Sequence, residues 1–173
     1  PQGILAGLQF PDSQSANLPI PNSPTFLLIR GQIRDPGNLG TLIRSADAAG
    51  VDAVLIPPET TDPFAPKVVR AGMGAHFHLP ILSMGWEEIG RISESANQRV
   101  MLADMDGDSC WEMDLRQPLT LIVGGEAEGA SNEARNLASQ RIRIPMAGRT
   151  ESLNAAVAGS VLMFEVLRQR KEK

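Results

Sequence analysis

Residues 26–56, FLLIRGQIRDPGNLGTLIRSADAAGVDAVLI, contain an apolar run, a turn, a helical pattern and a second apolar run. Apolar residues in the middle part recur at the spacing of one helix face: Leu39, Leu42, Ile43 and Ala46. This periodicity predicts an amphipathic helix over Asn38–Ala49, which Gly50 ends. A strand, a helix and a second strand in this order are typical of a parallel sheet, because parallel neighbours need a crossover connection.

The same alternation continues along the chain and predicts an α/β fold with a mainly parallel, six-stranded sheet and helices on both faces. The predicted strands are Phe26–Arg30, Asp52–Ile56, Ala75–Ile81, Arg99–Ala103, Leu119–Val123 and Arg141–Ile144. The other predicted helices are Ala65–Ala71, Trp86–Ser95, Asn132–Ser139 and Asn154–Arg168.

The last predicted helix is apolar around nearly its whole circumference, so it must be buried on every side. The sheet can cover one side only. Either a second subunit or another helix of the same chain must cover the other, and we favour a homodimer over a wholly internal helix.

Length and composition favour one globular domain, since 173 residues with 42% apolar content can bury one substantial core. The single cysteine, Cys110, has no partner for a disulfide within the chain, which favours the cytoplasm. The longest uncharged stretch, Ser152–Phe164, is shorter than the roughly 20 residues of a membrane-spanning helix. Residues 1–24 hold five of the thirteen prolines without periodicity and have the composition of a linker, so we expect a fragment of a longer protein with a further segment upstream.

A net charge of −4 disfavours nucleic-acid binding, but arginines gather locally. Two groups are close in sequence: Arg30, Arg34 and Arg44, and Arg141, Arg143 and Arg149. The basic end of the chain is typical of a solvated helix end. No metal is expected, because His76 and His78 lack a ligand set and would share one face of a predicted strand.

Three segments follow predicted strands at the edge where parallel sheets place their sites. The first contains Asn38, which is either a helix cap or a site residue, and Arg44, which is either solvent-exposed or a phosphate ligand. The second, Gly124-Gly125-Glu126, is either a tight turn or a close approach of the backbone to a ligand. The third runs from Ile144 to Asn154, where Ser152 or Asn154 can cap the last helix.

Together these segments resemble the three signature motifs of the SpoU (TrmH-like) branch of the SPOUT RNA methyltransferases. The matching residues are Asn38, Gly40 and Arg44, then Gly124-Gly125-Glu126-Ala127-Glu128-Gly129, then Ile144-Pro145-Met146, Gly148, Glu151-Ser152-Leu153-Asn154 and the small-residue helix that follows. The similarity covers about residues 25–170. Gly125 and Ala127 depart from the pattern, which has a polar residue and a glycine there.

The resemblance implies an α/β fold with a C-terminal trefoil knot and a homodimer that binds S-adenosylmethionine and structured RNA. Backbone groups of the cofactor-binding loops would belong to Gly124, Ile144, Met146, Leu153 and Asn154. The implied catalytic residues are Arg44, with Asn38, Glu126, Ser152 and Asn154 orienting it and the ribose. Residues 25–173 would be the catalytic domain, and residues 1–24 a linker or the end of an N-terminal RNA-binding domain.

The resemblance therefore implies methyl transfer to a ribose 2'-hydroxyl of ribosomal or transfer RNA, with ribosomal RNA favoured. Arg44 would either accept the hydroxyl proton or stabilise the developing alkoxide while another group takes the proton. Two alternatives stay open. One is base methylation by the other SPOUT branch, and the other is a non-catalytic RNA-binding module with the same fold.

Overall fold

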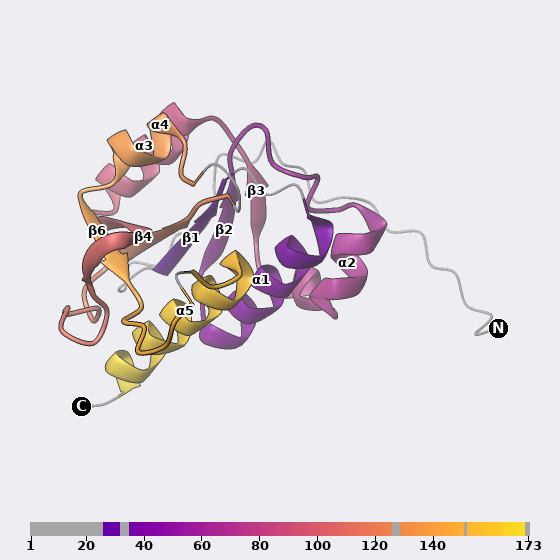
Figure 1. The fold of residues 1–173 in the computed structure, drawn as a ribbon. Coiled ribbons are helices and arrows are strands. Elements are labelled where there is room, and N and C mark those ends of the chain that lie inside the picture. The colour runs from indigo at the N-terminus through magenta and orange to yellow at the C-terminus, as the bar shows by residue number, and fades with distance from the viewer. Residues whose placement is uncertain (1–25, 32–34, 126–128, 151, 172–173) are drawn as a thin grey trace.

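The computed structural model describes residues 26–31, 35–125, 129–150 and 152–171. Within these residues the chain forms one six-stranded sheet with helices on both faces (Figure 1). The strands are β1 (Phe26–Arg30), β2 (Ala53–Ile56), β3 (Ile81–Ser83), β4 (Arg99–Ser109), β5 (Leu119–Val123) and β6 (Gln140–Arg143). Their order is β3-β2-β1-β5-β4-β6, and each neighbouring pair is parallel. The predicted α/β fold is confirmed.

The helices are α1 (Pro36–Ala49), α2 (Pro66–Gly72), α3 (Trp86–Ser95), α4 (Asn132–Leu137) and α5 (Ala155–Lys171), with a short 3-10 helix η1 (Ala75–Phe77). Helices α1, α2 and α5 cover one face of the sheet and α3 and α4 the other (Figure 1). Alternate residues of β1 follow this division, since Phe26 and Leu28 point to the first face and Leu27 and Ile29 to the second. Both faces of the sheet are therefore buried.

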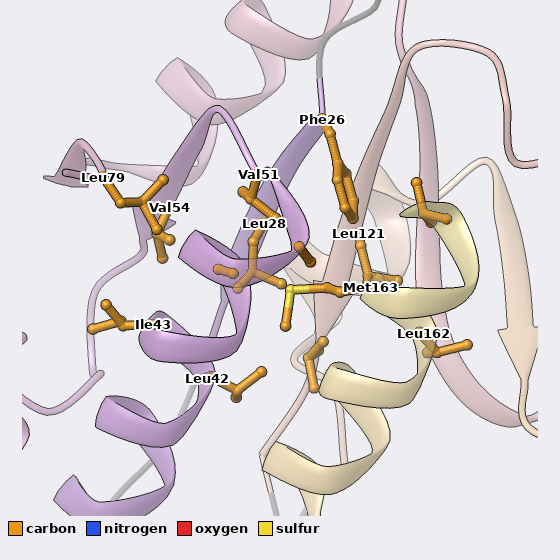
Figure 2. Close-up of a cluster of buried hydrophobic side chains, with 14 of the residues drawn as sticks. Phe26, Leu28, Leu42, Ile43, Val51, Val54, Leu79, Leu121, Leu162 and Met163 are labelled. Carbon is orange, nitrogen blue, oxygen red and sulfur yellow. The ribbon is translucent and has the colours of Figure 1, made fainter. Parts of the chain in front are cut away.

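Helices α1 and α5 lie side by side on the sheet and form the larger apolar cluster. Figure 2 shows Leu42 and Ile43 of α1, Leu162 and Met163 of α5, and Leu28 and Leu121 of the sheet in this layer. Ser160 of α5 donates a hydrogen bond from its hydroxyl to that of Ser45 on α1, at 2.8 Å. This hydrogen bond joins the N-terminal half of α5 to the C-terminal half of α1.

The predicted strand Ala75–Ile81 is wrong. After α2, Met73 and Gly74 adopt left-handed conformations with φ of 50° and 96°, and the chain enters η1. Pro80 lacks an N–H to donate, and the strand begins only at Ile81. His76 is therefore half-buried, with its Nε2 2.8 Å from the Pro63 carbonyl, whereas His78 is exposed.

Strand β4 is longer than predicted, because it continues past Ala103 through a register shift to Ser109. The remaining boundaries agree with the sequence to within a few residues. Among the helices that the structure describes, none combines the length and apolar character needed to cross a bilayer.

Helix α5 is not wholly internal in the single chain, which contradicts the alternative of an internal helix. It buries Ala156, Leu162 and Met163, but Val157 is 48% and Phe164 46% exposed. One apolar side of the helix therefore has no cover within the described part of the chain.

Candidate functional site

The candidate site lies at the carboxyl ends of β1 and β5, which are neighbours in the sheet with Arg30 opposite Val123. After β1 the chain continues into α1 on one face, and after β5 it continues into α4 on the other (Figure 1). Open α/β sheets bind ligands where connections leave to opposite faces in this way. The first two sequence motifs start at this position.

Asn38 is not the cap of α1. Asp35 caps the helix by accepting a hydrogen bond from the Gly37 N–H at 3.0 Å, and Pro36 occupies the first helical position. Asn38 is the third helical residue, so its side chain has no capping role. The structural interpretation of Asn38 drawn from the sequence is therefore wrong.

Asn154 connects the first motif to the third. Its Oδ1 accepts hydrogen bonds from the N–H groups of Ala156 (2.9 Å) and Val157 (3.2 Å), so it caps α5 as predicted. Its Nδ2 donates to Oδ1 of Asn38 at 3.3 Å. One amide side chain thus orders the start of α5 and holds it against α1.

The described residues of the second motif, Gly124, Gly125 and Gly129, lie close together after β5. A Cβ atom on Gly124 would lie 3.1 Å from both the N and Cα atoms of Ala130, so the glycine permits this close approach. The Gly125 N–H donates to the Gly129 carbonyl at 3.2 Å, which closes the turn. Three motif residues, Glu126, Ala127 and Glu128, lie outside the described residues.

The segment between β6 and α5 offers its backbone to a ligand. It starts next to β4 at one edge of the sheet and ends where α5 packs against α1. Backbone hydrogen bonds among the described residues involve neither residues 144–150 nor residues 152–153. Met146 and Leu153 are 38% and 39% exposed. Peptide N–H and C=O groups without a backbone hydrogen bond are available to a ligand. They fit a ligand that is held mainly through main-chain contacts, as the resemblance implies for S-adenosylmethionine.

Arg44 does not touch the Asn38–Asn154 pair. It lies two turns along α1, about 9 Å beyond Asn38, and is exposed outside the apolar stripe. Within the described residues its guanidinium makes no hydrogen bond or ion pair. Ser152 is exposed as well. The structure thus brings Asn38, Asn154 and Gly124 to one edge and leaves Arg44 and Ser152 open to solvent there.

The sequence analysis assigned no individual role to Arg30, the last residue of β1. Its side chain is fully buried, and Nη1 donates to the carbonyls of Val123 (2.9 Å) and Gly124 (2.6 Å). Arg30 cannot contact an RNA phosphate, contrary to its place among the clustered arginines. The sequence feature that could have indicated a buried role for Arg30 is a single charged residue at the end of an otherwise apolar strand, FLLIR.

Cys110 is a poor nucleophile in this environment. The thiol is buried beyond the end of β4, and burial, reinforced by the nearby Glu165 carboxylate, raises the pKa of Cys110 to about 11. The thiol is protonated at neutral pH and does not support covalent catalysis. Among the described residues, no three His, Cys, Asp or Glu side chains gather closely enough to hold a metal ion.

Comparison with known proteins identifies a family model, described as the SpoU rRNA Methylase family, that matches residues 25–164. The mouse (Mus musculus) protein named rRNA methyltransferase 3, mitochondrial, is 32% identical over 226 residues, which cover 100% of this chain and 54% of that protein. The 23S rRNA (uridine(2479)-2'-O)-methyltransferase of Streptomyces viridochromogenes is 33% identical over 180 residues, which cover 98% of this chain and 61% of that protein.

A similar solved structure is the SpoU methyltransferase AviRb from Streptomyces viridochromogenes in complex with the cofactor AdoMet. It matches with a TM-score of 0.79 and 32% identity, over 87% of this chain and 62% of that chain. The chain therefore spans between half and two thirds of the length of these relatives.

Proposed function

The chain belongs to the SpoU rRNA methylase family, and from this premise we propose that it transfers a methyl group from S-adenosylmethionine to a ribose 2'-hydroxyl of structured RNA. The observation that carries the proposal is the Asn154–Asn38 hydrogen bond, which joins the third motif to the first beside the end of β5. Ribosomal RNA is the favoured substrate, because relatives that cover nearly the whole chain are named for it.

Binding of S-adenosylmethionine is assigned to the backbone of Gly124, Ile144, Met146 and Leu153, with Asn154 ordering the last of these. When bound, the cofactor supplies an electrophilic methyl group on a sulfonium. The open peptide groups between β6 and α5 support this assignment.

The residues of the first motif are assigned to the ribose. Methyl transfer forms a bond from the 2'-oxygen to the methyl carbon and breaks the bond from that carbon to sulfur, so the oxygen must be held in line. Asn38, with Asn154, Ser152 and Glu126, would orient the sugar. Exposure of Arg44 on α1 leaves its guanidinium open to an RNA backbone.

Arg44 then acts in one of two ways. It accepts the hydroxyl proton itself, or it stabilises the developing alkoxide while water removes the proton. A guanidinium group is hard to deprotonate, and this favours the second way.

Product analysis tests the proposed reaction. The protein is incubated with methyl-labelled S-adenosylmethionine and with ribosomal or transfer RNA transcribed in vitro, and the RNA is then hydrolysed with alkali. We expect the label in alkali-resistant dinucleotides, because a 2'-O-methyl blocks cleavage at that linkage. Label in alkali-released mononucleotides would instead indicate base methylation, and cofactor binding without any transfer would indicate a non-catalytic module.

The uncovered side of α5 supports a homodimer. Val157 and Phe164 are seven residues apart and lie on the same side of the helix, where a second copy can bury both.

The path of the C-terminal segment is compatible with a trefoil knot, which we propose as in the family. The segment after β6 leads from one edge of the sheet to α5, which packs on α1. A crystal structure of the whole chain tests the knot. A backbone path in which the C-terminal segment passes through no loop of the chain would contradict it.

A further inference from the structure

Arg30 places a buried cation directly beneath the turn that starts the second motif. It is the last residue of β1, its side chain has no solvent exposure, and its own carbonyl accepts a hydrogen bond from the Thr60 hydroxyl at 3.3 Å. The following residue, Gly31, is packed beneath Pro57 and Trp86. The backbone that carries Arg30 is thus held from both sides.

The two hydrogen bonds of Arg30 converge on the point where β5 ends. A single nitrogen, Nη1, donates to the carbonyl of Val123 and to that of Gly124, at 2.9 Å and 2.6 Å. Successive carbonyls of an extended strand point in opposite directions. Two consecutive carbonyls reach one nitrogen only where the backbone leaves the extended conformation, so Arg30 binds the junction between the end of β5 and the turn.

Arg30 therefore determines the orientation of the peptide between Gly124 and Gly125. The carbonyl of this peptide is engaged by Arg30, and its N–H donates to the Gly129 carbonyl. Hydrogen bonds from a charged donor are about twice as strong as neutral ones, and they are strengthened further by burial. Without the guanidinium, the half-buried Gly124 carbonyl would lose its charged donor, and the turn would reorient toward water.

We propose that Arg30 is a positioning residue for S-adenosylmethionine, acting through the Val123 and Gly124 carbonyls to hold the second-motif turn in its cofactor-binding conformation. This inference rests on the proposed function, specifically on the contact of the cofactor with the Gly124 backbone. Arg30 touches neither the cofactor nor the RNA, so its loss raises the KM for S-adenosylmethionine and leaves the KM for RNA unchanged.

The test measures cofactor affinity in full-length chains carrying Arg30→Gln and Arg30→Lys. Calorimetry with S-adenosylmethionine and with S-adenosylhomocysteine gives the two dissociation constants. For Arg30→Gln we expect both to rise about tenfold or more, because the role is geometric and two charge-assisted hydrogen bonds are lost. Arg30→Lys retains a charged donor and should fall between this variant and the parent.

Arg170→Gln is the matched control for loss of a buried arginine. Arg170 is partly buried, lies over the Phe26 ring at 5.2 Å and donates to the Gln117 carbonyl at 3.0 Å, at the other end of β1 and β5. This variant should lose stability but bind both ligands with parental affinity. Thermal melts monitored by circular dichroism establish that each variant is folded at the temperature of the binding measurement.

The outcomes separate the inference from the proposed function. Parental affinity in a folded Arg30→Gln variant would overturn the positioning role, as would a change for one ligand alone, which indicates a long-range charge effect. If Arg30→Gln does not fold, Arg30→Lys provides the test. Parental cofactor affinity in this variant, together with an unchanged rate of amide hydrogen exchange at Gly125, would overturn the positioning role. Failure of the parent chain to bind either ligand would instead defeat the proposed function.

Discussion

The guanidinium of Arg44 is open to solvent on α1, whereas that of Arg30 is buried fourteen positions earlier, at the end of β1. The exposed group can meet an RNA phosphate or alkoxide, and the buried group can act only on the protein backbone. Exposure of Arg44 follows from its place outside the apolar stripe of its own helix. Burial of Arg30 depends on carbonyls 93 and 94 residues away, and no local pattern indicates it.

Arg44→Ala should abolish methyl transfer and leave cofactor binding intact. Loss of an acid–base or electrostatic group at the reacting oxygen lowers kcat by about 100-fold or more. The Kd for S-adenosylmethionine, measured by calorimetry, should change less than about twofold because the assigned cofactor contacts come from other segments. Arg91→Ala, an exposed arginine on α3 at the other face, should retain full activity. Retained turnover in Arg44→Ala would remove this residue from the mechanism.

Asn154→Ser separates the two tasks of Asn154. Serine caps a helix as well as asparagine does, so the free energy of unfolding should change by less than about 0.5 kcal/mol. Its side chain is too short to reach Asn38, and methyl transfer should fall. Asn154→Ala should lose the cap as well, at a cost of about 1 kcal/mol. Urea denaturation and single-turnover rates measure the two effects, and a fully active serine variant would show that the bond to Asn38 is dispensable.

At the scale of elements, α1 is positioned by close contact with its neighbours. The sequence predicted its length and buried face, because both follow from the periodicity of its own residues. It did not predict that Gly40, a motif residue, serves packing: a Cβ there would lie 2.5 Å from Cβ of Ala71 and 2.6 Å from the Val68 carbonyl oxygen of α2. Nor could the periodicity of apolar residues distinguish a strand at Ala75–Ile81 from η1. The direction of the chain after α2 depends on two residues in left-handed conformations, Met73 and Gly74.

Gly40→Ala should destabilise the protein despite improving helix propensity. The propensity gain is about 1 kcal/mol, whereas overpacking against a backbone carbonyl costs about 1–3 kcal/mol. We expect a net loss of about 1 kcal/mol in urea denaturation. Gly37→Ala on the same helix is the control, since the nearest atom to its added Cβ is 3.4 Å away, and it should be as stable as the parent. Equal stability of the two variants would contradict the close packing of α1 on α2.

At the scale of the whole molecule, the sheet order brings together motifs that are far apart in sequence. The alternation of strands and helices predicted the class of fold, but it carries no information on which strands are neighbours. The placement of β5 beside β1, and hence of Gly124 beside the start of α1, depends on long-range packing. The resemblance to a known family predicted this convergence. The cytoplasmic location and the limits of the domain stay predictions.

Phe164→Glu should dissociate the proposed homodimer, because it places a charge in the apolar stripe of α5. Sedimentation should show a dimer for the parent and a monomer for this variant. Phe77→Glu is the control, since Phe77 is 68% exposed on η1, away from α5, and this variant should stay dimeric. A monomeric parent at tens of micromolar would contradict the proposed dimer.

The most direct test of the account is to map the S-adenosylmethionine site by amide chemical shifts during a titration. If the cofactor is held at the carboxyl ends of β1 and β5, the largest changes should fall at Gly124 and Gly125, at residues 144, 146 and 147, and at residues 152–154. Amides at the opposite end of the sheet, such as those of Asp52 and Arg99, should not move. Saturable binding with its largest changes at that opposite end would contradict the assignment of the site.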